Sequence, residues 1–268
     1  MISGPLLRHT WRTHRVRLGI IALSLGIWAF LMPVIYATFG REMETLLKSG
    51  IIPDAFLRLM GADPFSINGS VALGAVHPIA IALEIVYPVG FAAAAIAGER
   101  QRGTLEVLLS RPVSRRSLYV TLLLAVITAA IVTTAATTLG TVAGAVLYDV
   151  AGGLDAGEMA LLGLNTVLLL AALGGISLAA SASFDRLTPA IGIALAVTLV
   201  GYVLEILGTL WPDAAFLQPY SLFHYLHPLE ILGGKASPED FLVLASVLVA
   251  STAFGLWHFP RRDLAAPT

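Results

Sequence analysis

The chain has 268 residues, of which 57% are hydrophobic and only 12% are charged, and its formal net charge is −1. Soluble domains carry about 25% charged residues, so the composition excludes an ordinary soluble protein, and the balanced charge gives no indication of nucleic-acid binding. The absence of cysteine excludes disulfides, thiolate metal sites and cysteine nucleophiles. With a mean hydropathy of +0.85, the chain is expected to be an all-α integral membrane protein with a single transmembrane domain, residues 1–268.

The N-terminal stretch, residues 1–17, carries four arginines and Trp11 ahead of the first apolar segment. Their spacing predicts an amphipathic helix on the inner membrane surface, with the arginines toward anionic headgroups and Trp11 at the interface. The alternative is that these arginines are ordinary topogenic charges.

Six apolar segments are long enough to cross a bilayer, which takes about 20 residues each. The expected spans are 18–39, 76–97, 117–148, 159–184, 187–210 and 241–259. Two larger outer loops, 40–75 and 211–240, connect them, and the first loop contains two short amphipathic patterns, REMETLLKS and DAFLRLMG.

Basic residues are distributed unevenly between the two sides of this topology. With the N-terminus in the cytosol, 12 of the 16 Lys and Arg residues lie in cytoplasmic segments. The positive-inside rule therefore favours six spans with both termini cytoplasmic. The Ala, Gly, Val and Arg usage is typical of a GC-rich bacterial genome, so a bacterial cell membrane is the expected location.

The cytoplasmic loop 98–116 has a pattern of its own between spans two and three. Gly98 allows the second span to end, Gly103 permits a further turn, and Thr104 is expected to cap a short helix over residues 105–110. Pro112 is expected to end that helix, and Ser114 is placed to cap the third span.

The short helix is predicted to have two different faces. Leu105, Leu108 and Leu109 share one face by the i, i+3, i+4 rule, whereas Glu106 and the flanking arginines occupy the other. Lipid or a partner protein is expected to cover the leucines. The alternative is a topogenic loop whose leucines face lipid.

The run GERQRGTLEVLLSRPVSRRSLY resembles the cytoplasmic signature of the permease subunits of type-2 ABC exporters. That resemblance implies a coupling helix that docks in a groove of the ATP-hydrolysing subunit, and a permease that is not itself an enzyme. The residues carried over to the coupling role are Glu99, Arg102, Gly103, Thr104, Leu105, Glu106, Leu108, Leu109, Pro112 and Arg115.

The resemblance also implies partners. No G-x-x-x-x-G-K-[ST] motif occurs in the chain, so ATP and Mg²⁺ are expected on a separate ABC ATPase subunit, present in two copies. A second permease chain, identical or homologous, is expected to complete the transmembrane set, with membrane lipid around it. Cargo is not fixed by the resemblance. The alternatives are an ion-coupled secondary transporter, or a membrane scaffold that recruits a cytoplasmic partner.

Two acids lie inside expected spans, Glu84 in the second and Glu205 in the fifth. Since an acid in a span usually faces a cavity, a partner or the interface, they are candidates for cargo contact or an outer gate. The alternative is a shallow carboxyl that reaches water or hydrogen-bonds a neighbouring helix. Thr134 and Thr138 in the third span either line a polar path or bond back to their own helix.

The second outer loop contains the run His224, His227 and Glu230. Spacing of three could place these side chains on one helical face as metal ligands. Pro228 interrupts that geometry, so no metal site is expected.

Overall fold

The computed structural model describes residues 3–48, 66–110 and 113–263, which contain helices and no strands. The α-helices in chain order are α1 (Gly4–Lys48), α3 (Ile67–Val76), α4 (Pro78–Ala94), α5 (Ala97–Gln101), α6 (Thr104–Leu109), α7 (Arg115–Leu147), α8 (Ala156–Ser183), α9 (Leu187–Leu210), α10 (Pro228–Leu232) and α11 (Pro238–Arg261). The short 3-10 helices are η1 (Ala151–Gly153), η2 (Pro212–Tyr220) and η3 (Leu222–Tyr225).

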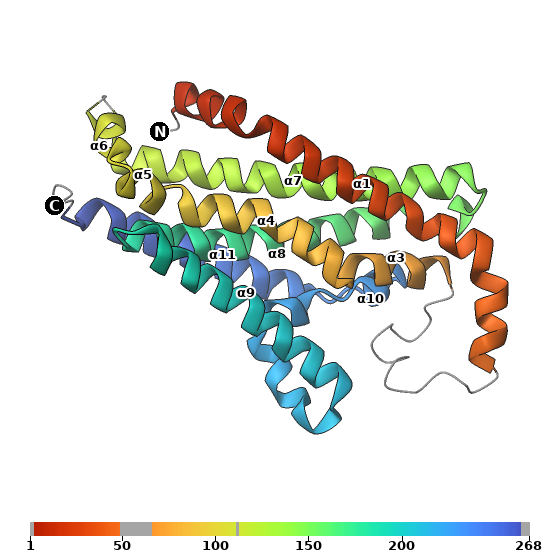
Figure 1. Ribbon diagram of the computed structural model, residues 1–268. Helices are drawn as coiled ribbons and strands as arrows, with labels where there is room; N and C mark the ends of the chain where they lie inside the picture. The colour runs from red at the N-terminus through yellow and green to blue at the C-terminus, as the bar shows by residue number, and fades with distance from the viewer. Residues whose placement is uncertain (1–2, 49–65, 111–112, 264–268) are drawn as a thin grey trace.

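The long helices run side by side, and both chain ends lie at the same end of the bundle as α5 and α6 (Figure 1). Among the described residues, five helices (α1, α7, α8, α9 and α11) are long and apolar enough to cross a membrane. The pair α3–α4 supplies a sixth span if its two halves are taken together. An all-helical membrane protein with five or six spans therefore agrees with the composition.

The second span differs from its expected range of 76–97. It is built from two helices that meet at His77 with a bend of 51°. Pro78 has no N–H and disfavours a helical conformation at the preceding residue, so α3 ends there, and the His77 side chain caps α4 by accepting from the N–H of Ile79 at 3.3 Å. Residues 67–75, expected in an outer loop, are thus helical.

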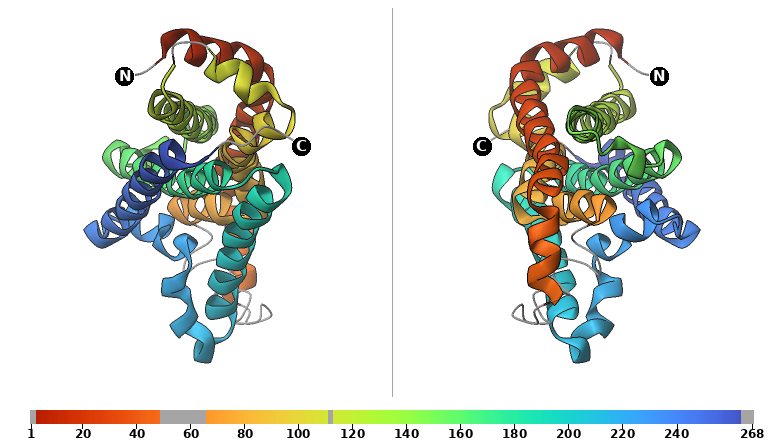
Figure 2. Two further views of the ribbon diagram at one scale, coloured as in Figure 1. Left: turned by 90° about the vertical axis from the view of Figure 1, so that its left-hand side faces the viewer. Right: turned by 90° about the vertical axis from the view of Figure 1, so that its right-hand side faces the viewer.

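The first helix is also longer than expected at both ends. Residues 4–17 form the first turns of α1 rather than a separate helix, and Figure 2 shows these turns crossing the end of the bundle at an angle to the rest. The His14 ring packs edge-on against Phe91 at a centroid distance of 5.0 Å. At its other end α1 continues to Lys48 and includes most of REMETLLKS, whereas DAFLRLMG lies outside the described residues.

Glycine allows α1 and α7 to approach closely. A Cβ atom built at Gly140 would lie 2.1 Å from the backbone oxygen of Gly26, and one at Gly144 would lie 2.4 Å from that of Phe30. Small residues let helix backbones touch where lipid supplies no hydrophobic drive. The G-x-x-x-G pair of the third span therefore packs within the chain.

Gly140→Leu should lower the melting temperature of the purified protein, because the new side chain would meet backbone that cannot rotate away. Overpacking costs about 1–3 kcal/mol, and we expect the upper part of that range. Gly192→Leu on α9 is the matched control, since nothing lies within 4 Å of the corresponding Cβ position. Equal melting temperatures for the two variants would contradict the α1–α7 contact.

One of the three clusters of buried apolar residues in the described part of the chain lies near the α5–α6 end. Leu118, Tyr119 and Leu122 of α7 pack with Leu178 of α8 and Phe259 of α11, and all five side chains are buried. This cluster fixes the helix ends that carry the short helices between α4 and α7.

Candidate functional site

The α5–α6 segment, residues 97–110, projects from the end of the bundle next to both termini (Figure 1). Hydrogen bonds hold it to the bundle at the break between α4 and α5. There the Ser181 hydroxyl of α8 accepts hydrogen bonds from the N–H groups of Ile96 and Ala97 at 3.0 and 2.9 Å. A side chain thus satisfies two backbone donors that the break leaves without helical partners.

Gly103 makes the turn between the two short helices. Its φ of +72° lies in the left-handed region that glycine adopts without strain, and its N–H donates to the Arg100 oxygen at 2.9 Å. The expected turn at Gly103 is therefore present.

Thr104 does not cap the helix as expected. It is the first residue of α6, after Gly103 at the cap position, and its hydroxyl lies 3.0 Å from the backbone oxygen of Glu99 and 2.5 Å from its carboxylate. Arg102 forms an ion pair with the same carboxylate. Sequence reasoning treated Thr104 as a local cap because it could not show α5 folding back on α6.

Burial raises the pKa of Glu99, but the hydrogen bonds from Thr104 and Arg102 and the positive charge of Arg102 outweigh burial. The pKa of Glu99 therefore lies below its ordinary value. The stabilisation that this carboxylate gives the α5–α6 turn is present above the ordinary carboxyl pKa and is lost as the pH falls.

The apolar face of α6 is only partly open to a partner. Leu105 is 1% exposed and packs into the cluster around Tyr119, and Leu109 packs against the edge of that cluster. The expectation that lipid or a partner must cover all three leucines is wrong for Leu105, because the bundle itself buries it. Val107 is 64% exposed, so it lies on the open surface of α6.

The remaining residues expected to take part in coupling lie in different surroundings. Leu108 is half-buried and Glu106 is exposed on α6, whereas Pro112 lies outside the described residues. Arg115 begins α7 and donates to the backbone oxygen of Arg262 at 2.5 Å. The predicted cap of the third span is confirmed, since the Ser114 hydroxyl accepts from the N–H of Ser117 at 3.2 Å.

A polar cluster that sequence reasoning missed joins this segment to the rest of the bundle. Asp185, in the short link between α8 and α9, pairs with Arg100 of α5 at 2.8 Å and with Arg262 at the end of α11. Beside it, the side chain of Gln101 accepts from the N–H of Leu187 at 2.8 Å. The available signal was an acid next to Arg186 in a segment expected on the side that carries most of the arginines.

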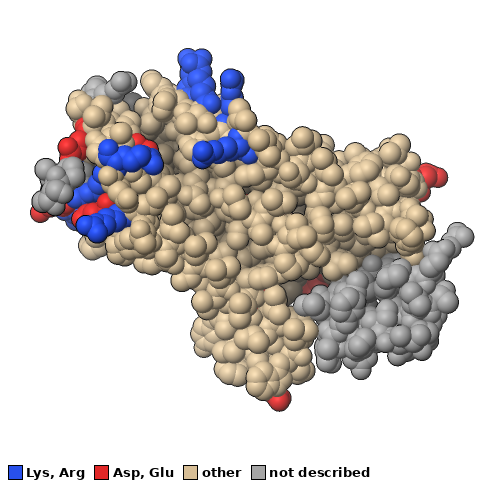
Figure 3. Space-filling model, viewed as in Figure 1, with Lys and Arg blue, Asp and Glu red and all other residues tan. Residues whose placement is uncertain are grey.

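Figure 3 shows Lys and Arg gathered near this end of the molecule, while most of the remaining surface on this face is uncharged. We call Arg100, Asp185 and Arg262 the Asp185 cluster. The side chains of Arg100 and Arg262 are only 12% and 15% exposed, whereas that of Asp185 is 58% exposed.

Glu84 lies in a different place, inside the bundle. It is 6% exposed and lines a cavity of about 50 Å³ between α1, α3, α4, α7 and α8. Thr134 and Thr138 line the same cavity, so the structure brings three of the four expected interior residues together. The hydroxyl of Thr138 bonds back to the backbone oxygen of Thr134 at 3.0 Å, whereas that of Thr134 makes no hydrogen bond to any residue described.

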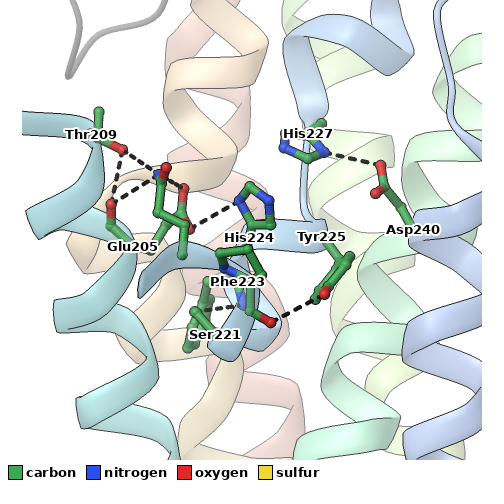
Figure 4. Close-up of polar contacts among 10 residues, drawn as sticks. Glu205, Thr209, Ser221, Phe223, His224, Tyr225, His227 and Asp240 are labelled. Atoms are coloured by element: carbon green, nitrogen blue, oxygen red, sulfur yellow. Dashed lines mark hydrogen bonds and ion pairs between the residues drawn. The ribbon is translucent and has the colours of Figure 1, made fainter. Parts of the chain in front are cut away.

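Glu205 belongs to a separate polar network that joins α9 to the loop after it (Figure 4). Its carboxylate accepts from the Gln218 side chain at 2.9 Å and lies 3.5 Å from the His224 ring. Glu205 of α9 is therefore held by the loop that follows α9 and does not line the Glu84 cavity.

The histidine run does not converge on a metal site. His227 pairs with Asp240 of α11 at 2.9 Å while His224 pairs with Glu205, and Glu230 is exposed (Figure 4). Within residues 3–48, 66–110 and 113–263, no three His, Cys, Asp or Glu side chains are grouped to hold a metal ion.

The comparisons with known proteins identify one relationship. The family model for the ABC-2 family transporter protein matches residues 15–264. No match was found among curated proteins or among solved structures.

Proposed function

The chain belongs to the ABC-2 family of transporter proteins, and from this membership we propose that it is the permease of an ATP-driven exporter. The family consists of non-catalytic, multi-pass membrane subunits of ABC transporters. Such a subunit works with an ABC ATPase in general. The proposal goes beyond family membership in three respects: the direction of transport, the coupling element and the composition of the assembly.

In this proposal the α5–α6 segment is the coupling element. The observation that carries the proposal is that α6 has one side chain fixed in the bundle and others free at the surface. Leu105 is buried in the bundle, while Glu106 and Val107 of the same short helix are exposed and form what we call the rim of α6. A force on the rim would therefore reach α4 and α7 directly. Closure of the ATPase on ATP would supply that force and a contact that differs between the two states of the bundle.

The assembly would contain two ATPase subunits, which bind ATP and Mg²⁺, and a second permease chain, identical or homologous. Both termini and the α5–α6 segment would face the cytosol of a bacterial cell, the orientation that the positive-inside rule favours. Residues 4–17 would lie along the inner membrane surface at the start of α1.

The interior acids and threonines would take part in the path or its gate. The Glu205 network would hold the loop after α9 as part of an outer gate. Glu84, Thr134 and Thr138 would form polar lining, but their cavity of about 50 Å³ is far smaller than the roughly 300–1,000 Å³ of pockets for drug-sized ligands. Cargo of that size would need a wider opening than this protomer alone encloses.

A single-cysteine experiment tests the proposal, because the chain has no cysteine of its own. Val107→Cys should react with a membrane-impermeant maleimide only from the cytosolic side, and bound ATPase should slow the reaction. Tyr220→Cys, at a position 80% exposed in the loop after α9, is the control and should react only from outside. Labelling of Val107→Cys from outside, or at the same rate with and without the ATPase, would exclude the coupling role.

A further inference from the structure

The Glu84 cavity has a chemical character that coupling does not explain. Its lining is apolar except for the carboxyl of Glu84, one indole and five threonine hydroxyls. None of the described residues that line it is Lys, Arg or His. The only formal charge that the described lining can carry is therefore negative.

Most hydrogen-bond donors around the cavity are already committed. Thr137 and Thr138 donate to the backbone oxygen of Thr134 at 2.7 and 3.0 Å, and Thr166 donates to that of Leu162 at 2.9 Å. The Trp28 indole donates to Gly74 at 3.0 Å. Since a hydroxyl has one proton and two lone pairs, these threonines can offer only lone pairs to a ligand.

Three buried residues at the cavity, Glu84, Thr134 and Thr141, have side chains without a hydrogen bond to the described residues. Thr134 is 5% exposed, and its hydroxyl bonds to none of the described residues. The Glu84 carboxyl likewise has no hydrogen bond or ion pair to the part of the chain that the structure describes, although it is 6% exposed. Buried polar groups are normally satisfied, and a buried charge is normally paired.

We propose that this cavity binds one small monovalent cation, with the Glu84 carboxylate and threonine oxygens as ligands. Hard cations prefer such oxygen ligands, and divalent ions usually gather more than one carboxylate, whereas a single charge balances a monovalent ion. A water molecule needs about 10–15 Å³ on the same measure of volume, so about 50 Å³ holds an ion with one or two waters. The site lies within one protomer, and ion binding to it requires neither ATPase nor cargo, so it can be tested separately from the proposed transport.

Trp28 lines the cavity and can report binding. The other three tryptophans, Trp11, Trp211 and Trp257, are 45%, 60% and 56% exposed and can be replaced by phenylalanine. The remaining fluorescence of the full chain in lipid nanodiscs should then change saturably with sodium or potassium chloride. Choline chloride at the same ionic strength should have no effect.

Single substitutions test which side chains bind the ion. Glu84→Gln should abolish the saturable change, and Thr138→Val should weaken it about tenfold, the loss expected when one bond to a charged group is removed. Thr128→Val is the matched control on α7, because its hydroxyl donates to Leu124 at 2.7 Å and does not line the cavity. It should bind as the parent does.

Three results would overturn the proposal. The first is a Glu84→Gln variant that responds like its parent. The second is a parent that responds to pH alone, equally in sodium, potassium and choline, since Glu84 would then hold a proton. If Glu84→Gln fails to fold, equal affinity in Thr138→Val and Thr128→Val would be the third.

Discussion

Gly103→Pro should abolish ATP-dependent transport while the chain still reaches the membrane at a normal level. The turn at Gly103 has a φ of +72°, whereas proline is restricted to about −65°. Proline would also remove the N–H that donates to Arg100 at 2.9 Å. The α5–α6 turn would open, and α6 would no longer present its rim at a fixed angle to the ATPase.

The measurement is cargo-stimulated ATP hydrolysis and transport by the reconstituted complex. Gly103→Asn is the matched control, because asparagine tolerates the left-handed region better than other non-glycine residues, and it should retain most of the activity. Full coupled activity in a well-expressed Gly103→Pro complex would show that the α5–α6 segment does not transmit the motion.

Local chemistry explains which parts of this fold could be predicted from the sequence. Apolar length and the scarcity of charge indicated an all-helical membrane protein, and the expected range 187–210 coincides with α9. Ser114 was recognised as a cap because a cap depends on residues next to it in the chain. Gly103 was recognised as a turn for the same reason.

The break at His77 was missed although Pro78 was visible. Apolar length does not reveal a bend, because α3 and α4 taken together are as apolar as one straight span. The role of Thr104 was missed for another reason. Its hydroxyl bonds to Glu99, which requires α5 to fold back on α6, and no local pattern contains that information.

The interior site was predicted only in part. Glu84, Thr134 and Thr138 were singled out one at a time, and the structure brings them to one cavity. Glu205 was a candidate for the same roles as Glu84, cargo contact or an outer gate, but it bonds to Gln218 and lies close to His224 in the loop that follows its own helix. Which helices are neighbours is decided by packing, so a single sequence could not separate the two acids.

Asp185→Asn should uncouple transport from ATP hydrolysis with little loss of stability. The Asp185 cluster is the described charged link between α5, the α8–α9 connection and the end of α11. Because the Asp185 side chain is 58% exposed, its ion pairs should contribute only about 0–1 kcal/mol to stability. Its effect on coupling should be larger, since Arg100 moves with the segment that the ATPase would push.

We expect the amount of cargo moved per ATP hydrolysed to fall by about fivefold or more, the range of a coupling free energy of roughly 1–3 kcal/mol, while the melting temperature stays close to that of the parent. Asp185→Glu should restore part of the transport. Asp213→Asn is the control, because this exposed acid lies in η2, at the other end of α9 from Asp185. If Asp185→Asn moves as much cargo per ATP as Asp213→Asn, α5 acts on α4 and α7 alone, and the helices α8, α9 and α11 follow by packing.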